Sequence, residues 1–133
     1  MKIHPRHVLT KRGRVDLVTA LLHGPAGSAE AVAESLRQVA KNQPSRRGTA
    51  GQKHAMLTQT RSDDDIRRIT APTLVLHGTA DVLMPYSGAQ RLVELIPGVQ
   101  LVSLPDAGHS YMADRPDASN QALLDFLRAH PVA

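Results

Sequence analysis

Residues 71–81 read Ala-Pro-Thr-Leu-Val-Leu-His-Gly-Thr-Ala-Asp, and the fold class of the chain follows from them. Pro72 ends whatever structure precedes it, and the β-branched and aliphatic residues from 73 to 77 predict a short strand. Gly78 breaks that strand, and Asp81 follows just past its carboxyl end. Because ligands and catalytic groups gather at this edge of open parallel sheets, we predict a functional role for Asp81.

A helix, a second strand and a last helix follow this stretch. Ser87 is a candidate N-cap for a helix that ends at 97–98 and carries a buried stripe of Ala89, Leu92, Val93 and Ile96. Residues 99–104 predict a strand and residues 105–109 a tight loop. The last helix starts at 116 or 117 and places on one face Leu123, Phe126 and Leu127. This order predicts the α/β class, as a βαβα unit with parallel strands.

The first 70 residues predict helices rather than a sheet. Residues 15–22 are short and apolar, and periodicity alone leaves helix and strand both open. Ser28 is a candidate N-cap for an amphipathic helix that ends near Asn42. We expect a basic loop at 44–51, a short helix at 52–60 and an acidic turn capped by Ser62. The chain therefore divides into a helical cap-like segment, 1–70, and an α/β core segment, 71–133.

Two parallel strands make a poor free-standing sheet, because parallel sheets are normally covered on both faces and flanked by further strands. Either residues 15–22 supply a third strand, or the βαβα unit belongs against a sheet that this chain does not contain. We favour the second interpretation. It leaves a strand edge open for self-association or for pairing with a partner.

Composition and charge narrow the function classes. The chain has no cysteine, which excludes disulfides, thiolate metal sites and a cysteine nucleophile and fits a reducing compartment. Residues 1–61 hold 11 Lys and Arg against 3 Asp and Glu, whereas residues 62–133 hold 5 against 9. No aromatic side chain lies among the basic residues to stack on bases, so we interpret them as a solvated face and expect no nucleic-acid partner.

Targeting, metal and cofactor signals are also missing. No apolar segment follows Met1-Lys2 as in a secretory leader, and no apolar run approaches the roughly 18 residues of a membrane-spanning helix. We therefore expect a cytoplasmic protein without membrane contacts. His4 and His7 lack an identifiable third ligand, so we expect no metal site. No dinucleotide- or phosphate-binding glycine motif is present, and we expect no cofactor.

Both predicted strands end in loops that carry a group suited to proton transfer: Asp81 follows the first strand and His109 the second. Adjacent parallel strands lie roughly 5 Å apart, so loops at the same sheet edge can bring a carboxylate to an imidazole. An Asp that accepts from one ring nitrogen leaves the other as a general base. Asp106 competes as the partner of His109, but its place in the tight loop favours a turn role. We predict the catalytic pair Asp81 and His109.

These residues give the chain a family resemblance. Residues 72–81, Ile-Pro-Gly at 96–98 and Ala-Gly-His-Ser at 107–110 resemble the C-terminal part of an α/β-hydrolase. The resemblance implies that Asp81 is the acid and His109 the base of a Ser-His-Asp type triad. The upstream half resembles the cap region of aclacinomycin-methylesterase-like esterases of that family, with residues 48–50, Gln52 and Ala55 in its loop. A small ester-like molecule is therefore the implied substrate.

The family's nucleophile is missing from this resemblance. It sits in a Gly-x-Ser-x-Gly elbow, and no such pattern occurs in the 133 residues. Residues 23–28, His-Gly-Pro-Ala-Gly-Ser, superficially resemble the family's oxyanion loop, but too few residues separate them from the strand at 73–77 to hold the elbow. We expect little activity from this chain alone and full activity only when a missing part complements it. A degenerate fragment that serves as a non-catalytic interaction module is the alternative.

Overall fold

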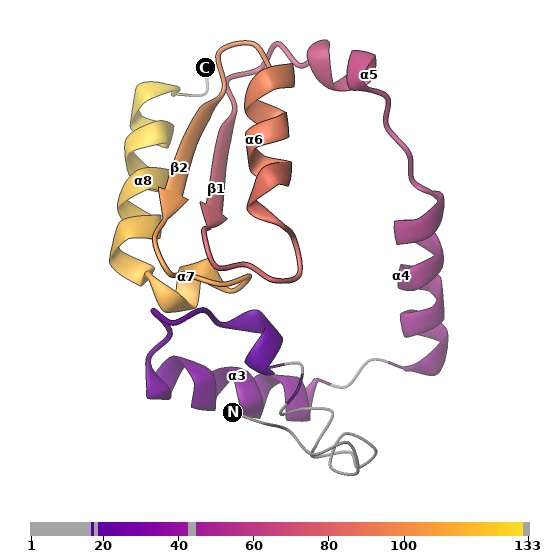
Figure 1. Ribbon diagram of the computed structural model, residues 1–133, viewed down its shortest axis with the longest axis vertical. Helices are drawn as coiled ribbons and strands as arrows, with labels where there is room; N and C mark the ends of the chain where they lie inside the picture. Colours follow the sequence, from indigo (N-terminus) through magenta and orange to yellow (C-terminus); the bar gives the residue numbers. More distant parts are fainter. Residues whose placement is uncertain (1–16, 18, 43–44, 132–133) are drawn as a thin grey trace.

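The computed structural model describes residues 17, 19–42 and 45–131, and helices cover much of this part of the chain. Residues 17 and 19–22 are helical, so the apolar segment at 15–22 forms no strand in its described part. The elements that follow are α3 (Ala29–Lys41), α4 (Arg46–Thr58), α5 (Asp63–Arg67), β1 (Leu74–Gly78), α6 (Tyr86–Leu95), β2 (Gln100–Leu104), α7 (Tyr111–Asp114) and α8 (Pro116–Ala129) (Figure 1).

The two strands form one parallel sheet, as the sequence predicts. Leu74 pairs with Gln100 at one end of the register and Gly78 pairs with Leu104 at the other. Helix α6 makes the crossover between the strands, and α8 follows β2 after the single turn of α7. Both strands therefore end at the same edge of the sheet, which is the edge that carries the two predicted catalytic residues.

Helices α6 and α8 cover opposite faces of this small sheet (Figure 1). Val75 and His77 line a cavity together with residues of α6, whereas Leu74 and Val102 line another together with residues of α8. Successive side chains of a strand point to opposite faces, which accounts for the placement of Leu74, Val75 and His77. Leu76 also lines the first cavity. The buried apolar residues lie close to the sheet and its two connecting loops, and they are Ala89, Leu95, Ile96, Leu104 and Ala107.

The capping residues upstream of the sheet are where the sequence predicts them. The Ser28 hydroxyl accepts a hydrogen bond from the backbone N–H of Ala31, and α3 ends with Asn42 as its C-cap. Ser62 and Asp65 form a reciprocal capping box at the start of α5. The predicted loop at 44–51 is wrong over most of its length, because Ser45 caps α4 by accepting from the N–H of Gly48 and the helix continues through the glycines.

Two predictions on helix α6 are also wrong. Helix α6 starts at Tyr86 with Pro85 as its N-cap, so Ser87 lies within its first turn instead of capping it. Val93 is 42% exposed, and Leu95 is buried in its place. On α8 the predicted apolar face is largely open to solvent, since Leu123 and Leu127 are both exposed. Within the described residues, no helix combines the length and the apolar character needed to cross a membrane.

Candidate active site

The predicted acid, Asp81, lies in the loop at residues 79–85 that follows β1, here called the acid loop. Its Oδ1 accepts hydrogen bonds from the backbone N–H groups of Leu83 and Met84, at 2.8 and 2.9 Å. A short polar side chain that bonds to the backbone two and three residues ahead is typical of a tight turn. These two bonds fix one carboxylate oxygen and leave Oδ2 for another partner.

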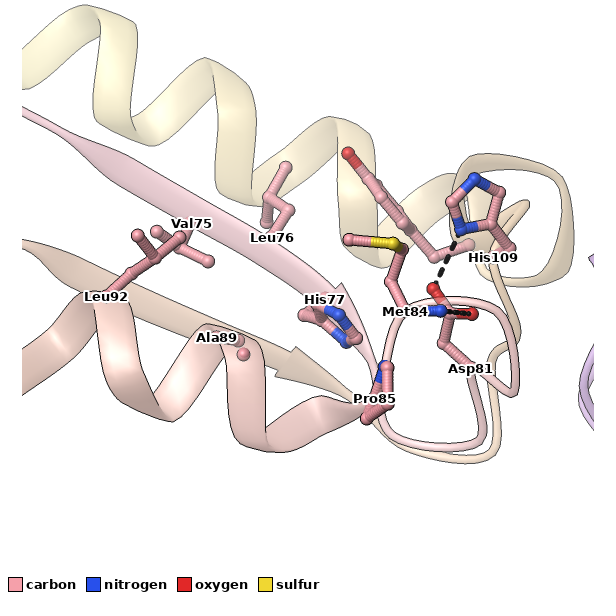
Figure 2. Close-up of a pocket in the computed structure, with 11 residues that line it drawn as sticks. Val75, Leu76, His77, Asp81, Met84, Pro85, Ala89, Leu92 and His109 are labelled. Atoms are coloured by element: carbon pink, nitrogen blue, oxygen red, sulfur yellow. Dashed lines mark hydrogen bonds and ion pairs between the residues drawn. The ribbon is translucent and has the colours of Figure 1, made fainter. Parts of the chain in front are cut away.

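That partner is His109, in the loop at residues 105–110 that follows β2, here called the histidine loop. The His109 Nδ1 lies 2.9 Å from the Asp81 Oδ2 (Figure 2). The Asp81 side chain is 6% exposed and the imidazole 43% exposed. The two residues that the sequence places at matched strand ends are thus hydrogen-bonded to each other, with the carboxylate on the inside and the ring at the surface.

The hydrogen bonds keep Asp81 ionised. Partial burial by itself raises the pKa of a carboxyl group, because it disfavours the charged form. At Asp81 this effect is outweighed by hydrogen bonds from the Met84 N–H, the His109 ring and the Leu83 N–H, and the pKa lies below its usual value. An anionic Asp81 can only accept, so the His109 Nδ1 carries the proton that it donates and the neutral ring has its lone pair on Nε2.

Asp106, the competing partner for His109, has a role in the turn. Its side chain is exposed, its φ is 58°, and its backbone N–H donates to the Thr79 Oγ1 at 3.0 Å. Aspartate tolerates this left-handed conformation better than most residues. The structure therefore pairs His109 with Asp81, and Asp106 shapes the loop in between.

The two loops are held against each other by a close backbone approach at Gly78. A Cβ on this residue would lie 2.3 Å from the Ala107 carbonyl oxygen and 2.4 Å from that of Gly108. Immediately beyond it, the N–H of Ala80 donates to the same Ala107 oxygen at 2.9 Å. Glycine at the end of β1 thus lets the histidine loop lie directly on the acid loop.

A cavity of about 490 Å³ opens beside the Asp81–His109 pair (Figure 2). Its walls are mostly aliphatic and come from β1, the acid loop and α6, including Val75, Leu76, Met84 and Leu92. Tyr111, which the sequence does not single out, also lines it. His77 faces this cavity, but its Nδ1 lies 2.9 Å from the Gly78 carbonyl oxygen and its ring packs edge-on to Tyr86, so it is a packed and hydrogen-bonded histidine.

A second histidine–aspartate pair lies behind the histidine loop, and the sequence does not predict it. His23 and Asp114 are hydrogen-bonded although 91 residues separate them. Segment 23–28 therefore lies against the histidine loop. Neither the sequence around His23 nor that around Asp114 contains a motif that predicts this contact.

No metal site emerges from the described residues, where no group of three or more His, Asp or Glu side chains could hold an ion. His4 and His7 lie outside the described residues.

Comparison with known proteins identifies a matching family and similar sequences. A family model described as "Alpha/beta hydrolase family" matches residues 4–122. A non-heme chloroperoxidase of Streptomyces lividans is 34% identical over 76 residues, which are 56% of this chain and 28% of that protein.

Solved structures of hydrolases superpose on nearly the whole chain. A serine hydrolase involved in carbazole degradation, the CarC enzyme, matches with a TM-score of 0.72 at 26% identity, over 91% of this chain and 48% of that one. A thermophilic esterase from Thermogutta terrifontis matches with a TM-score of 0.73 at 26% identity, over 95% of this chain and 51% of that one. This chain thus spans about half the length of the solved structures it matches.

Proposed function

Because the chain belongs to the alpha/beta hydrolase family, we propose that Asp81 and His109 are the acid and the base of a triad that hydrolyses ester-like substrates. The nucleophile of this triad comes from sequence outside these 133 residues. In this arrangement Asp81 holds the ring through Nδ1, and the His109 Nε2 removes the proton from the attacking hydroxyl and later returns it to the leaving group.

The observation that carries this proposal is the hydrogen bond between Asp81 and His109 at the carboxyl ends of two adjacent parallel strands. The carboxylate is shielded and triply hydrogen-bonded, and the ring is accessible beside an apolar cavity. A base needs this combination of a fixed tautomer and an exposed second nitrogen. The aliphatic cavity wall suits the apolar part of an acyl or alkyl group.

The missing nucleophile sets the expected activity of the chain by itself. No Gly-x-Ser-x-Gly pattern occurs in the sequence, so the base has no activated hydroxyl to deprotonate. A triad without its serine keeps only what binding and an oxyanion hole supply. We therefore infer that the isolated chain turns esters over at close to the rate of buffer.

Complementation tests the proposal. The purified chain is assayed on short p-nitrophenyl esters alone and after co-expression with the nucleophile-bearing half of the T. terrifontis esterase. We expect turnover only in the complemented sample, and we expect it to disappear in His109→Gln and Asp81→Asn. Asp106→Asn, which changes the competing carboxylate, is the matched control and keeps it. Turnover by the chain alone that survives His109→Ala or a serine-directed inhibitor would sink the proposal.

The free edge of β1 favours a second candidate function, a non-catalytic interaction module. The Thr73 carbonyl oxygen accepts from the Gln100 N–H, and the Thr79 N–H donates to the Leu104 carbonyl oxygen. The backbone N–H and C=O groups of the odd-numbered residues therefore point toward β2. By alternation the backbone groups of Leu74 and Leu76 face away from β2, and they have no hydrogen-bond partner within the described part of the chain. Such an edge is a template for a further strand.

A proline at the free edge tests this second function. In Leu76→Pro the lost N–H lies on the open side, so the β1–β2 pairing survives while strand addition is blocked. Light scattering coupled to size exclusion should show an assembly for the unmodified chain and a monomer for the variant. A cooperatively folded monomer at all concentrations, without any captured partner, counts against the interaction module.

A further inference from the structure

The histidine loop is held from two sides, and only one of them is β1. On the other side, the N–H of Ser110 donates to the Leu22 carbonyl oxygen at 2.7 Å, and the N–H of Ala26 donates to the Asp106 carbonyl oxygen at 2.9 Å. Leu22 and segment 23–28, which lie far upstream in the sequence, are therefore bonded to both flanks of His109. The direction in which His109 leaves its loop depends on this segment as well as on the sheet.

Asp114 ties the segment to the loop. Its Oδ2 accepts from the backbone N–H of Gly24 and from that of Gly108, both at 2.8 Å, and its Oδ1 is hydrogen-bonded to the His23 Nδ1. The side chain has no exposed surface. Burial by itself raises the pKa of this carboxyl, but the hydrogen bonds from Gly24, Gly108 and His23 bring the pKa below its usual value, so the group is an anion at neutral pH.

Two features couple the position of segment 23–28 to that of His109. Gly108, whose N–H binds Asp114, directly precedes His109 in the chain. A Cβ on Gly24 would lie 2.2 Å from the Asp106 carbonyl oxygen and 2.6 Å from the Gly108 nitrogen, so only glycine permits this approach. A shift of segment 23–28 must therefore move the backbone that carries the base.

His23 extends the contact to helix α3, because its Nε2 lies 2.8 Å from the Ser35 Oγ. The set Ser35–His23–Asp114 resembles a nucleophilic triad only in its atom types. The His23 side chain is 4% exposed, and the N–H groups of Gly24 and Gly108 already donate to Asp114. Neither cavity that flanks the sheet is lined by Ser35. A shielded, fully bonded set of this kind fits a structural bridge.

We propose that Asp114 is a positioning residue for His109, which holds Gly108 and segment 23–28 together so that the imidazole meets Asp81. The proposal rests on the proposed function of His109 as the base. It assigns Asp114 no contact with substrate. Removal of its charge loosens the histidine loop, and the His109–Asp81 hydrogen bond is then formed for a smaller fraction of the time.

Nuclear magnetic resonance on the full chain tests this without any need for turnover. The pKa of Asp81 is measured by carboxyl ¹³C titration, and the proton position on His109 by ring ¹⁵N shifts. In Asp114→Asn we expect the Asp81 pKa to rise toward its value in His109→Gln, and the His109 ring to lose its fixed Nδ1–H form. Asp125→Asn, an exposed carboxylate that bonds to Gln121 and Arg128 on α8, is the matched control and leaves both readouts unchanged.

Gly24→Ala supplies a second variant in case Asp114→Asn does not fold. It displaces segment 23–28 by the backbone clash and leaves the Asp114 carboxylate intact, and we expect the same changes at Asp81 and His109. Gly51→Ala, where an added Cβ meets nothing within 4 Å, is its control. A folded Asp114→Asn or Gly24→Ala protein with an unchanged Asp81 pKa and an unchanged His109 ring overturns the proposal. Failure of ester hydrolysis after complementation would instead contradict the proposed role of His109 as the base. The two failures are therefore distinguishable.

Discussion

Replacing Asp81 by asparagine isolates the hydrogen bond on which the candidate site depends. The amide oxygen of the new side chain can still accept from Leu83 and Met84, both of which bond to a single carboxylate oxygen in the structure. The charge-assisted bond to His109 is lost. Such a bond contributes roughly 1.5–3 kcal/mol when shielded, but the ring is 43% exposed and water competes for it. We therefore expect a loss of about 1–2 kcal/mol in unfolding free energy.

The pH dependence of this loss is the sharper part of the prediction. The Asp81 pKa is lower in the folded chain than its usual value. Its stabilisation is therefore fully present above the ordinary carboxyl pKa of about 3.9 and is lost as the pH falls through the folded value. Asparagine does not titrate. The difference in unfolding free energy between the original chain and Asp81→Asn should be largest at neutral pH and shrink in acid, since other carboxylates contribute equally to both proteins.

Urea unfolding followed by circular dichroism, repeated from pH 7 down to the acid limit of the folded state, measures this difference. At neutral pH the corresponding fall in melting temperature is about 3–10 °C. Asp106→Asn is the control, because Asp106 is exposed and asparagine also tolerates its positive φ. The hydrogen-bond account fails if Asp81→Asn matches the original chain at pH 7, if the difference does not depend on pH, or if Asp106→Asn is the more damaging change.

Three further predictions concern stability and use the same unfolding measurement. Leu104→Ala should cost about 2–5 kcal/mol, because Leu104 is 2% exposed in a small core; a loss below about 1 kcal/mol would mean that the site collapses around the gap. Gly78→Ala should destabilise the chain strongly, since its Cβ would lie 2.3 Å from a backbone oxygen, whereas Gly88→Ala, with nothing within 4 Å, should not; equal effects would contradict the close approach. Ser28→Ala should cost about 1 kcal/mol by removing the cap of α3, and an unchanged midpoint would show that this helix adds nothing to the folding unit.

Strands and helix caps that depend on a few neighbouring residues are predicted correctly from the sequence. The strand at 73–77 follows from a proline, a run of β-branched and aliphatic residues and a glycine, and β1 occupies residues 74–78. The caps Ser28 and Ser62 follow from hydroxyl groups placed just before apolar or acidic runs. Ser87 fails as a cap because the acid loop brings Pro85 to that position, and the direction in which a loop enters a helix is not encoded in a single side chain.

The Asp81–His109 pair was predictable because both residues directly follow strands of one parallel sheet, and strand pairing converts their sequence positions into neighbouring positions in space. The burial of α8 was not predictable in this way. Its apolar face is regular in sequence, yet Leu123 and Leu127 are exposed in the structure. Periodicity indicates that a helix has an apolar face, but it does not indicate which surface, if any, packs against that face.

The α/β class, the two parallel strands and the meeting of Asp81 with His109 at their carboxyl ends therefore follow from the amino-acid sequence alone. What holds the histidine loop in place is a property of the folded chain. The contact of Asp114 with His23, Gly24 and Gly108 joins segments some 90 residues apart. The physical reason is that a buried carboxylate takes its partners from whichever backbone N–H groups packing brings to it, and no spacing along the chain records that choice.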